Sequence, residues 1–525
     1  MWSVASADGT KARQQEANGG SDLCDPADPS PFLIACHESI LNKSEATAHA
    51  LAPIAGRDYA DSAINCSGSH CSRFVLLKSP IFCAAIIQIS PGFTAKCILR
   101  HWILGMINEG PLQRFEPLAG GLIKPIYADY SFGNIPNTIH YLLTGEHVGP
   151  LLPKDCFGGE YPRPEKVVLF FVDSFGWQFW REHQDRFRTT RRIIERGVLT
   201  PISALFPSTT AASVATLNFG VLPAVHAMYE WNIYVPAYGE VIQSLPFCPL
   251  GPRVVDACLT KGYDPYNLMT VRQTVHQRLA KHGVRSIQFT HRKHMTAAFN
   301  LIAASGAEVV GHGTLAEALV QLKDHLAQVS GKAWLNFYWD SIDGIAHVHG
   351  PGTSYHAAEI ASFWQTFDHV FHDVNAPDTI YLFVADHGHV DARESIYINQ
   401  RIPTLSEWLR VSPTGNPIYP NGSPRDLFIH VKQDRIEEAL ALLRHHLADI
   451  ALVLAVEAAL EEQLFGPHPI GAELRRRLGD IVVLPYTGYF VSWFERGLME
   501  NRARGHHGGL TAAELISALG VTDTL

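Results

Sequence analysis

The stretch Thr379-Ile380-Tyr381-Leu382-Phe383-Val384-Ala385-Asp386-His387-Gly388-His389 contains the features that decide the fold. Its apolar part has the length and composition of a buried strand, and two side chains that can bind a metal, Asp386 and His387, follow at once. Neighbouring side chains on an extended chain point to opposite sides, so both reach one ion only if the chain turns there. Ligand sites in α/β sheets cluster at the carboxyl ends of strands. Taken alone, the segment is equally consistent with an alternative to a metal site, in which Asp386 caps the next helix and His387 lies on the surface.

Similar apolar runs alternate with helical patterns from about residue 107 onward. Residues 167–172 are continuously apolar, which suits a strand buried on both faces. Strands that alternate with helices indicate an α/β fold, with a central, mostly parallel sheet flanked by helices. The predicted strands are residues 199–205, 286–289, 333–338, 379–385 and 426–431, and the predicted helices are residues 178–196, 211–219, 315–329, 355–372, 435–447 and 453–464, with another opening near Asn134.

The same patterns divide the chain into four parts. Residues 1–105 are rich in Ser, Ala, Gly and Cys and lack clear periodicity, which predicts a poorly ordered N-terminal extension. A misassigned gene start, with Met106 as the natural first residue, is a further hypothesis. Residues 106–404 are predicted to form the main core, residues 405–500 an inserted α+β subdomain, and residues 501–525 a return to the core.

Charge and composition narrow the classes of partner. The formal net charge of -9 argues against binding of a nucleic-acid polymer, because such binders carry a basic excess. An acidic protein can still bind phosphate compounds if metal ions supply the local positive charge. The 27 His residues favour a metal site, since His is the commonest metal ligand, although this number does not locate it.

Targeting and membrane signals are weak. The first residues lack the basic segment and apolar stretch of a secretory signal. The most apolar early stretch, residues 81–106, contains Pro91, Lys96, Arg100 and His101 and is a poor transmembrane candidate. The cysteine spacings fit no zinc ribbon, and reduced thiols are expected. We therefore expect a cytoplasmic protein without a membrane span, and we leave its oligomeric state open.

Two segments follow predicted strands in the way that Asp386 does. Asp173 comes directly after residues 167–172, where it either binds a ligand or caps the next helix. Residues 206–213 follow another strand and open a helix with two threonines, Thr209 and Thr210. A hydroxyl there meets backbone N–H groups and the positive end of the helix dipole, which favour phosphate. Plain capping is the alternative.

Two further segments supply more candidate ligands. Asp343 and His347 are four residues apart, so a helical turn places them on one face, and Asp340 competes with Asp343 for the role. Residues 505–509 read Gly-His-His-Gly-Gly, in which glycines permit close backbone approach around His507. A His pair on a surface loop is the alternative reading.

In their order along the chain, these segments resemble the alkaline phosphatase superfamily and, within it, the type I phosphodiesterase / nucleotide pyrophosphatase family. Asp343-Gly344-Ile345-Ala346-His347-Val348-His349-Gly350-Pro351 resembles that family's Asp-x-x-Gly-His-x-x-Gly-Pro, with Ala346 in place of Gly. Residues 206–210 resemble its nucleophile segment, and residues 222–226 resemble the Tyr-Pro-x-x-His stretch that follows.

The resemblance implies two divalent metal ions, usually zinc, with manganese as the alternative. Mixed His and carboxylate ligands suit Zn²⁺. By the resemblance, one ion is held by Asp343, His347 and His507, and the other by Asp173, Asp386, His387 and the nucleophile oxygen of Thr210.

The resemblance also implies catalytic roles. Thr210 matches the nucleophile best, because Ala211 then begins the helix, and Thr209 is the alternative. A covalent phospho-threonine would form and be hydrolysed. The family places an Asn after the nucleophile to donate to phosphate oxygens, and Ser213 is the nearest polar candidate here. His389 replaces the family's usual Met, either as an outer partner of the site or as an exposed side chain.

The expected activity is hydrolysis of phosphodiester or pyrophosphate bonds in a nucleotide or a related small phosphoester. A phosphomonoesterase or phosphomutase on the same core is the alternative, and a catalytically silent binding protein is the third reading. Residues 220–330 are expected to form the wall over the site, with aromatic candidates for substrate contact at Trp231, Tyr234, Tyr238, Phe289 and His294.

Overall fold

The structure is a computed structural model, and it describes residues 73–79, 82–89 and 105–525. The chain divides into two compact units, Met1–Thr94 and Ala95–Leu525. In the first unit, β1 (Arg73–Ser79) pairs with β2 (Phe82–Ile89) in antiparallel fashion. The rest of the predicted N-terminal extension lies outside the described residues.

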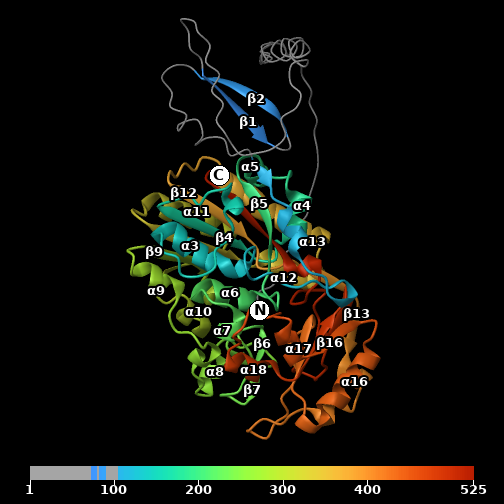
Figure 1. The fold of residues 1–525 in the computed structure, drawn as a ribbon. Helices are drawn as coiled ribbons and strands as arrows, with labels where there is room; N and C mark the ends of the chain where they lie inside the picture. The colour runs from blue at the N-terminus through green and yellow to red at the C-terminus, as the bar shows by residue number, and fades with distance from the viewer. Residues whose placement is uncertain (1–72, 80–81, 90–104) are drawn as a thin grey trace, which may run out of the picture. The chain divides into compact units, whose positions relative to one another are not determined.

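The second unit is built on an eight-stranded sheet (Figure 1). Neighbouring strands pair in parallel, except that β20 runs antiparallel to both of its neighbours. This arrangement confirms the predicted α/β class with a mostly parallel sheet. In order across the sheet, the strands are β10 (Glu308–His312), β9 (Arg285–His291), β11 (Ala333–Trp339), β4 (Lys166–Val172), β12 (Thr379–Val384), β20 (Ile516–Thr522), β5 (Val198–Ser203) and β3 (Met106–Ile107).

Strand β4 lies in the middle of the sheet, and its side chains alternate between two cores. Val168 and Phe170 face one core, while Val167 and Leu169 face the other. Burial on both faces explains the continuously apolar sequence of this strand. The first core is completed by the helices α4 (Trp177–His183), α5 (Arg188–Arg196), α11 (Leu315–Gln328) and α13 (Ser354–Val370), and the second by α3 (Ile135–Thr144), α6 (Thr210–Phe219) and α9 (Val275–Ala280).

Two predicted helices differ from the structure. Residues 178–196 form α4 and α5 with a turn between them, because Asp368 accepts hydrogen bonds from the backbone N–H groups of Arg188 (2.7 Å) and Thr189 (2.9 Å) and so starts a new helix. Residues 453–464 begin as a strand, β16 (Ala451–Ala455), which pairs with β17 (Ile481–Pro485), and only then form α17 (Val456–Glu461).

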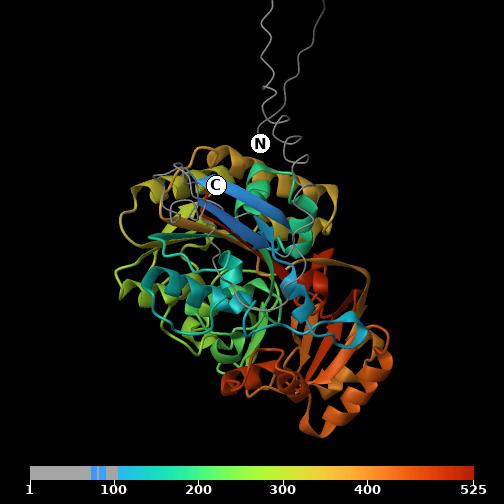
Figure 2. The same ribbon diagram turned by 45° about the horizontal axis from the view of Figure 1, so that its top comes forward.

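Residues 405–500 contain a four-stranded antiparallel sheet in the order β14 (Asn421–Ser423), β15 (Asp426–Ile429), β17 and β16, with α16 (Ile436–His446) packed on it. This orange segment lies beside the central sheet in both views (Figures 1 and 2). That residues 405–500 form an inserted subdomain of their own remains a prediction. None of the helices in the described part of the chain has the length and hydropathy needed to cross a bilayer.

Candidate active site

One edge of the central sheet gathers the residues that the sequence singled out. Asp173 follows β4 directly, and Asp386 and His387 follow the end of β12. Because β4 and β12 are parallel neighbours, their carboxyl ends meet. Helix α12 (Ser341–His349) begins just after β11, the strand on the other side of β4, and carries Asp343 and His347 to the same edge.

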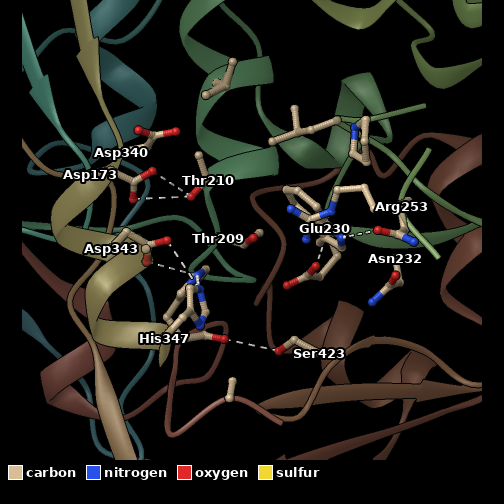
Figure 3. A pocket seen from close by; sticks show the side chains of 18 of the residues that line it. Asp173, Thr209, Thr210, Glu230, Asn232, Arg253, Asp340, Asp343, His347 and Ser423 are labelled. Carbon is tan, nitrogen blue, oxygen red and sulfur yellow. Dashed lines mark hydrogen bonds and ion pairs between the residues drawn. The ribbon is translucent and has the colours of Figure 1, made fainter. Parts of the chain in front are cut away.

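Thr210 is the first residue of α6 and lies at the centre of this edge. Its Oγ1 is 3.2 Å from Oδ2 of Asp173 (Figure 3). The same oxygen is 3.3 Å from Nε2 of His387. Thr209 takes the N-cap position, but its side chain caps no N–H of the helix. Between the two threonines, Thr210 is therefore the one whose hydroxyl meets the predicted ligands.

Asp173, Asp386 and His387 form a buried group. Nε2 of His387 lies 3.5 Å from Oδ1 of Asp173 and 3.2 Å from Oδ2 of Asp386, and all three side chains are nearly inaccessible to solvent. Burial raises the pKa of Asp173 well above its ordinary value, and the negative charges of Asp386 and Asp343 raise it further. Among the described residues, no Lys or Arg side chain pairs with Asp173 or Asp386.

A second group is formed by Asp343, His347 and His507. Nε2 of His347 lies 3.4 Å from Oδ2 of Asp343 and 3.2 Å from Nε2 of His507, and Nε2 of His507 lies 3.6 Å from Oδ1 of Asp343. His507 arrives here because β19 (Gly505–His506) pairs with β13 (Val390–Tyr397), which begins directly after His389. His506 also lines the cavity but joins none of the potential ligand groups, so the structure favours His507, and Asp340 likewise joins none.

The His rings in both groups are oriented by backbone carbonyls. Nδ1 of His347 lies 2.9 Å from the carbonyl oxygen of Gly505, Nδ1 of His507 lies 2.9 Å from that of Ser208, and Nδ1 of His387 lies 2.9 Å from that of Gly388. These acceptors place the proton on Nδ1 and leave Nε2 as a free ligand atom. Metal-binding histidines show this pattern, because the outer hydrogen bond fixes the tautomer and the ring.

The donor set fits metal ions. Three overlapping groups each bring their ligand atoms within 4.8 Å of one another. Oδ2 of Asp386 is buried and accepts no hydrogen bond, so an ion would satisfy an atom that the protein leaves bare. The mixture of imidazole and carboxylate donors suits a divalent metal such as zinc. The groups are Asp173, Asp386 and His387; Asp343, His387 and His507; and Asp343, His347 and His389.

Comparison with known proteins identifies the family. The sequence profile described as type I phosphodiesterase / nucleotide pyrophosphatase matches residues 167–510, which is more than half of the chain. The chain belongs to the type I phosphodiesterase / nucleotide pyrophosphatase family. As a member of this metal-dependent family, it is a hydrolase of phosphoester bonds of the phosphodiesterase or pyrophosphatase type.

Solved structures share the fold of this family member. Murine ectonucleotide pyrophosphatase / phosphodiesterase 5 is 13% identical, with a TM-score of 0.51 over 68% of this chain and 88% of the murine chain. The inactive threonine-to-alanine variant of that murine protein, in complex with AMP, gives the same identity and TM-score over 68% of this chain and 87% of the other. A comparison with curated proteins finds no match.

Ser213, the sequence-based candidate for a phosphate donor, is fully buried and does not line the cavity of this phosphodiesterase-family chain. Asn232, at the start of β6 (Asn232–Val235), does line it. One N–H of its amide donates to the carbonyl oxygen of Gly422 at 2.9 Å, which leaves the second N–H available. Asn218 also lines the cavity; its Nδ2 donates to the carbonyl oxygen of Val214 at 2.8 Å, and its Oδ1 lies 2.9 Å from Nε2 of His276.

His389 is buried, and it contacts the site that the family resemblance predicted around Asp343. Its Nδ1 lies 3.3 Å from Oδ1 of Asp343 and 3.1 Å from Oγ of Ser174. Its ring is therefore turned the other way from those of His347, His387 and His507, with Nδ1 toward the carboxylate. Of the two predicted readings, the structure supports an outer partner of the site and not an exposed side chain.

A cavity of about 760 Å³ adjoins the two ligand groups of this family member. Asp173, Thr210 and Asp343 lie on one side of it, and Asn232 and Arg253 lie on the other (Figure 3). Of the aromatic residues predicted to form its wall, Trp231 and His294 do so, whereas three others belong to the buried core and do not line it: Tyr234, Tyr238 and Phe289.

Proposed function

We propose that the protein hydrolyses phosphodiester or pyrophosphate bonds in nucleotides or related small phosphoesters, through a phospho-threonine at Thr210. The observation that carries this proposal is the position of Oγ1 of Thr210, at the N-terminus of α6 and within 3.3 Å of both Asp173 and His387. A helix N-terminus stabilises negative charge, which favours both a bound phosphate and an ionised hydroxyl.

In the first step, Oγ of Thr210 attacks phosphorus, and the bond between phosphorus and the leaving oxygen breaks. The carboxylate of Asp173 is the nearest acceptor for the hydroxyl proton, with Oδ2 3.2 Å from Oγ1 of Thr210. The second amide N–H of Asn232 is available to a nonbridging phosphate oxygen. Water then attacks the same phosphorus, the bond to Oγ breaks, and Thr210 regains its proton.

Two divalent ions would supply positive charge to the reacting phosphate and its leaving oxygen. Zinc suits the mixed His and carboxylate donors, and manganese is the alternative. Burial lowers the pKa of His507 well below its ordinary value, so the ring is a neutral ligand at neutral pH. The residues that would hold the ions are Asp343, His347 and His507 for one, and Asp173, Asp386 and His387, with Thr210, for the other.

The cavity supports a small substrate. Its volume of about 760 Å³ lies in the range of sites for small ligands and cofactors. The murine structure with the same fold carries AMP, and this makes nucleotide esters the first compounds to test. The net charge of -9 disfavours a nucleic-acid polymer as substrate.

The test is a comparison of bis-p-nitrophenyl phosphate with p-nitrophenyl phosphate after chelation and return of zinc or manganese. Preference for the diester supports the proposal, and preference for the monoester supports a phosphomonoesterase. Thr210→Ala should abolish turnover while leaving metal content unchanged, and Thr209→Ala is the matched control. Acid quenching during turnover of bis-p-nitrophenyl phosphate should trap a p-nitrophenyl phosphoryl group on the peptide that contains Thr210, because only one ester bond breaks in the first step. Full activity of Thr210→Ala would refute the covalent step.

A further inference from the structure

A third cluster of potential metal ligands lies away from the active site. His140, Glu146 and His282 bring their ligand atoms within 4.8 Å of one another. His140 is on α3 and Glu146 lies just beyond the C-terminus of that helix, whereas His282 lies in the turn between α9 and β9. The cluster therefore joins segments that are more than 130 residues apart in the sequence.

The hydrogen bonds of His140 leave its Nε2 atom free to bind a metal ion. Its Nδ1 lies 3.4 Å from the carbonyl oxygen of Glu146 and 3.3 Å from Oγ1 of Thr144, and that hydroxyl donates its own hydrogen to the carbonyl oxygen of His140. Both neighbours of Nδ1 are therefore acceptors, so Nδ1 carries the proton and the lone pair resides on Nε2.

Glu146 and His282 complete the set from the solvent side. Nε2 of His282 lies 3.0 Å from Oε2 of Glu146, and the side chains are 40% and 55% exposed, respectively. The ring of His282 stands perpendicular to that of His140, with centroids 5.4 Å apart. One buried and two accessible donors leave room for solvent to provide the remaining ligand.

We propose that His140, Glu146 and His282 bind a divalent transition-metal ion, with Zn²⁺ as the ion that best suits two imidazoles and a carboxylate. Zinc is held by two His, one Glu and a water in known protein sites. The hydrogen bonds of Nδ1 to the Thr144 hydroxyl and the Glu146 carbonyl supply the outer contacts that such a ligand uses.

The ion would cross-link α3 to the turn that follows α9. Both helices pack against α6, the helix that begins with Thr210, in one core that includes Leu142, Leu217 and Leu279. Nε2 of His276, on α9, also lies 2.9 Å from Oδ1 of Asn218, near the end of α6. A metal ion at this position would hold together the two helices that pack against α6.

The alternative is an ion pair between Glu146 and protonated His282 without any metal. Zinc titration of the metal-stripped full chain against a competing chromogenic chelator separates the two. We expect His282→Ala and Glu146→Gln to bind one zinc equivalent fewer than the wild type. The exposed His369 belongs to none of the ligand groups, so His369→Ala is the control and should bind as the wild type does.

Thermal unfolding gives a second measurement. Zinc should raise the Tm of the wild type and of His369→Ala by several degrees more than that of His282→Ala. The active-site ions are common to all of these variants, so they cancel in the comparison. Equal zinc stoichiometry and equal Tm shifts at micromolar free zinc would overturn the proposal and leave the ion pair alone.

Discussion

The Nε2 atoms of His347 and His507 lie 3.2 Å apart, although the two residues are 160 positions apart in the sequence. Each ring holds its Nδ1 against a backbone carbonyl oxygen, that of Gly505 or that of Ser208. Both Nε2 atoms therefore present lone pairs to each other, an arrangement that only a shared cation or proton makes favourable. The pair marks a place where the protein is organised around a positive charge.

Replacement of His507 by Ala should remove one ion and most of the activity. The loss should exceed the roughly 100-fold cost of removing an outer partner of a metal site, because a direct ligand disappears. Metal content by mass spectrometry and kcat/KM for a phosphodiester measure the effect. His506→Ala is the matched control, since His506 adjoins the site but belongs to no ligand group; equal losses in both variants would contradict the assignment.

His389→Met, which restores the family's usual residue, should weaken metal binding while leaving the fold intact. The contact of 3.3 Å between Nδ1 and Oδ1 of Asp343 is lost, and loss of such an outer partner lowers metal affinity by roughly 10–100-fold. Competition with a chelator measures the affinity, and circular dichroism checks the fold. Unchanged metal affinity in His389→Met would show that Asp343 does not depend on this contact.

The main elements of the fold, and the candidate ligands at the ends of its strands, could be predicted because they rest on local patterns. The buried runs of β4 and β12 are continuously apolar, and Asp173 and Asp386 lie where each strand ends. The place of β20 depends on tertiary pairing, and its sequence Ile-Ser-Ala-Leu-Gly-Val-Thr gives no clear strand signal. No sequence spacing points to Asn232, because tertiary structure alone brings it to the cavity.

Glu230 should make the stability of the protein depend on pH. Burial raises the pKa of Glu230 from 4.5 to about 7, against opposing hydrogen bonds from the backbone N–H groups of Trp231 and Asn232 and from Thr209. Between these two values the folded chain keeps a proton that the unfolded chain releases. The free energy of unfolding therefore falls as the pH rises through this window and levels off above it. The total change is about 3 kcal/mol.

Glu230→Gln removes this titration. The free energy of unfolding of the variant should therefore rise relative to that of the wild type as the pH increases from about 5 to about 8. Asp426 contributes in the same direction, because burial and the charge of Glu230 raise its pKa well above the ordinary value. Urea unfolding of both proteins across this range provides the measurement. Parallel stability curves for the two proteins would show that Glu230 does not titrate in this window.

The buried ion pair between Arg425 and Glu514 should be the most sensitive polar contact outside the active site. Nε and Nη2 of Arg425 each lie 2.9 Å from a different oxygen of Glu514, and both side chains are fully buried. Glu514→Gln leaves the guanidinium without a counter-charge, which should cost about 3–5 kcal/mol of unfolding free energy. Replacing both residues, as in Arg425→Met with Glu514→Leu, should cost less than Glu514→Gln alone, because no buried charge remains unpaired.

The matched control for this pair is Glu438→Gln, the same substitution at the partner of the exposed Arg435. An exposed ion pair contributes little to stability, because solvent screens it. The urea unfolding curve of this variant should therefore overlay that of the wild type. Urea unfolding followed by tryptophan fluorescence measures all three variants. A Glu514→Gln curve that overlays that of Glu438→Gln would mean that the buried pair adds no more than an exposed one. The carbonyl oxygens of Pro485, Tyr486 and Tyr489 would then be sufficient partners for the Arg425 guanidinium.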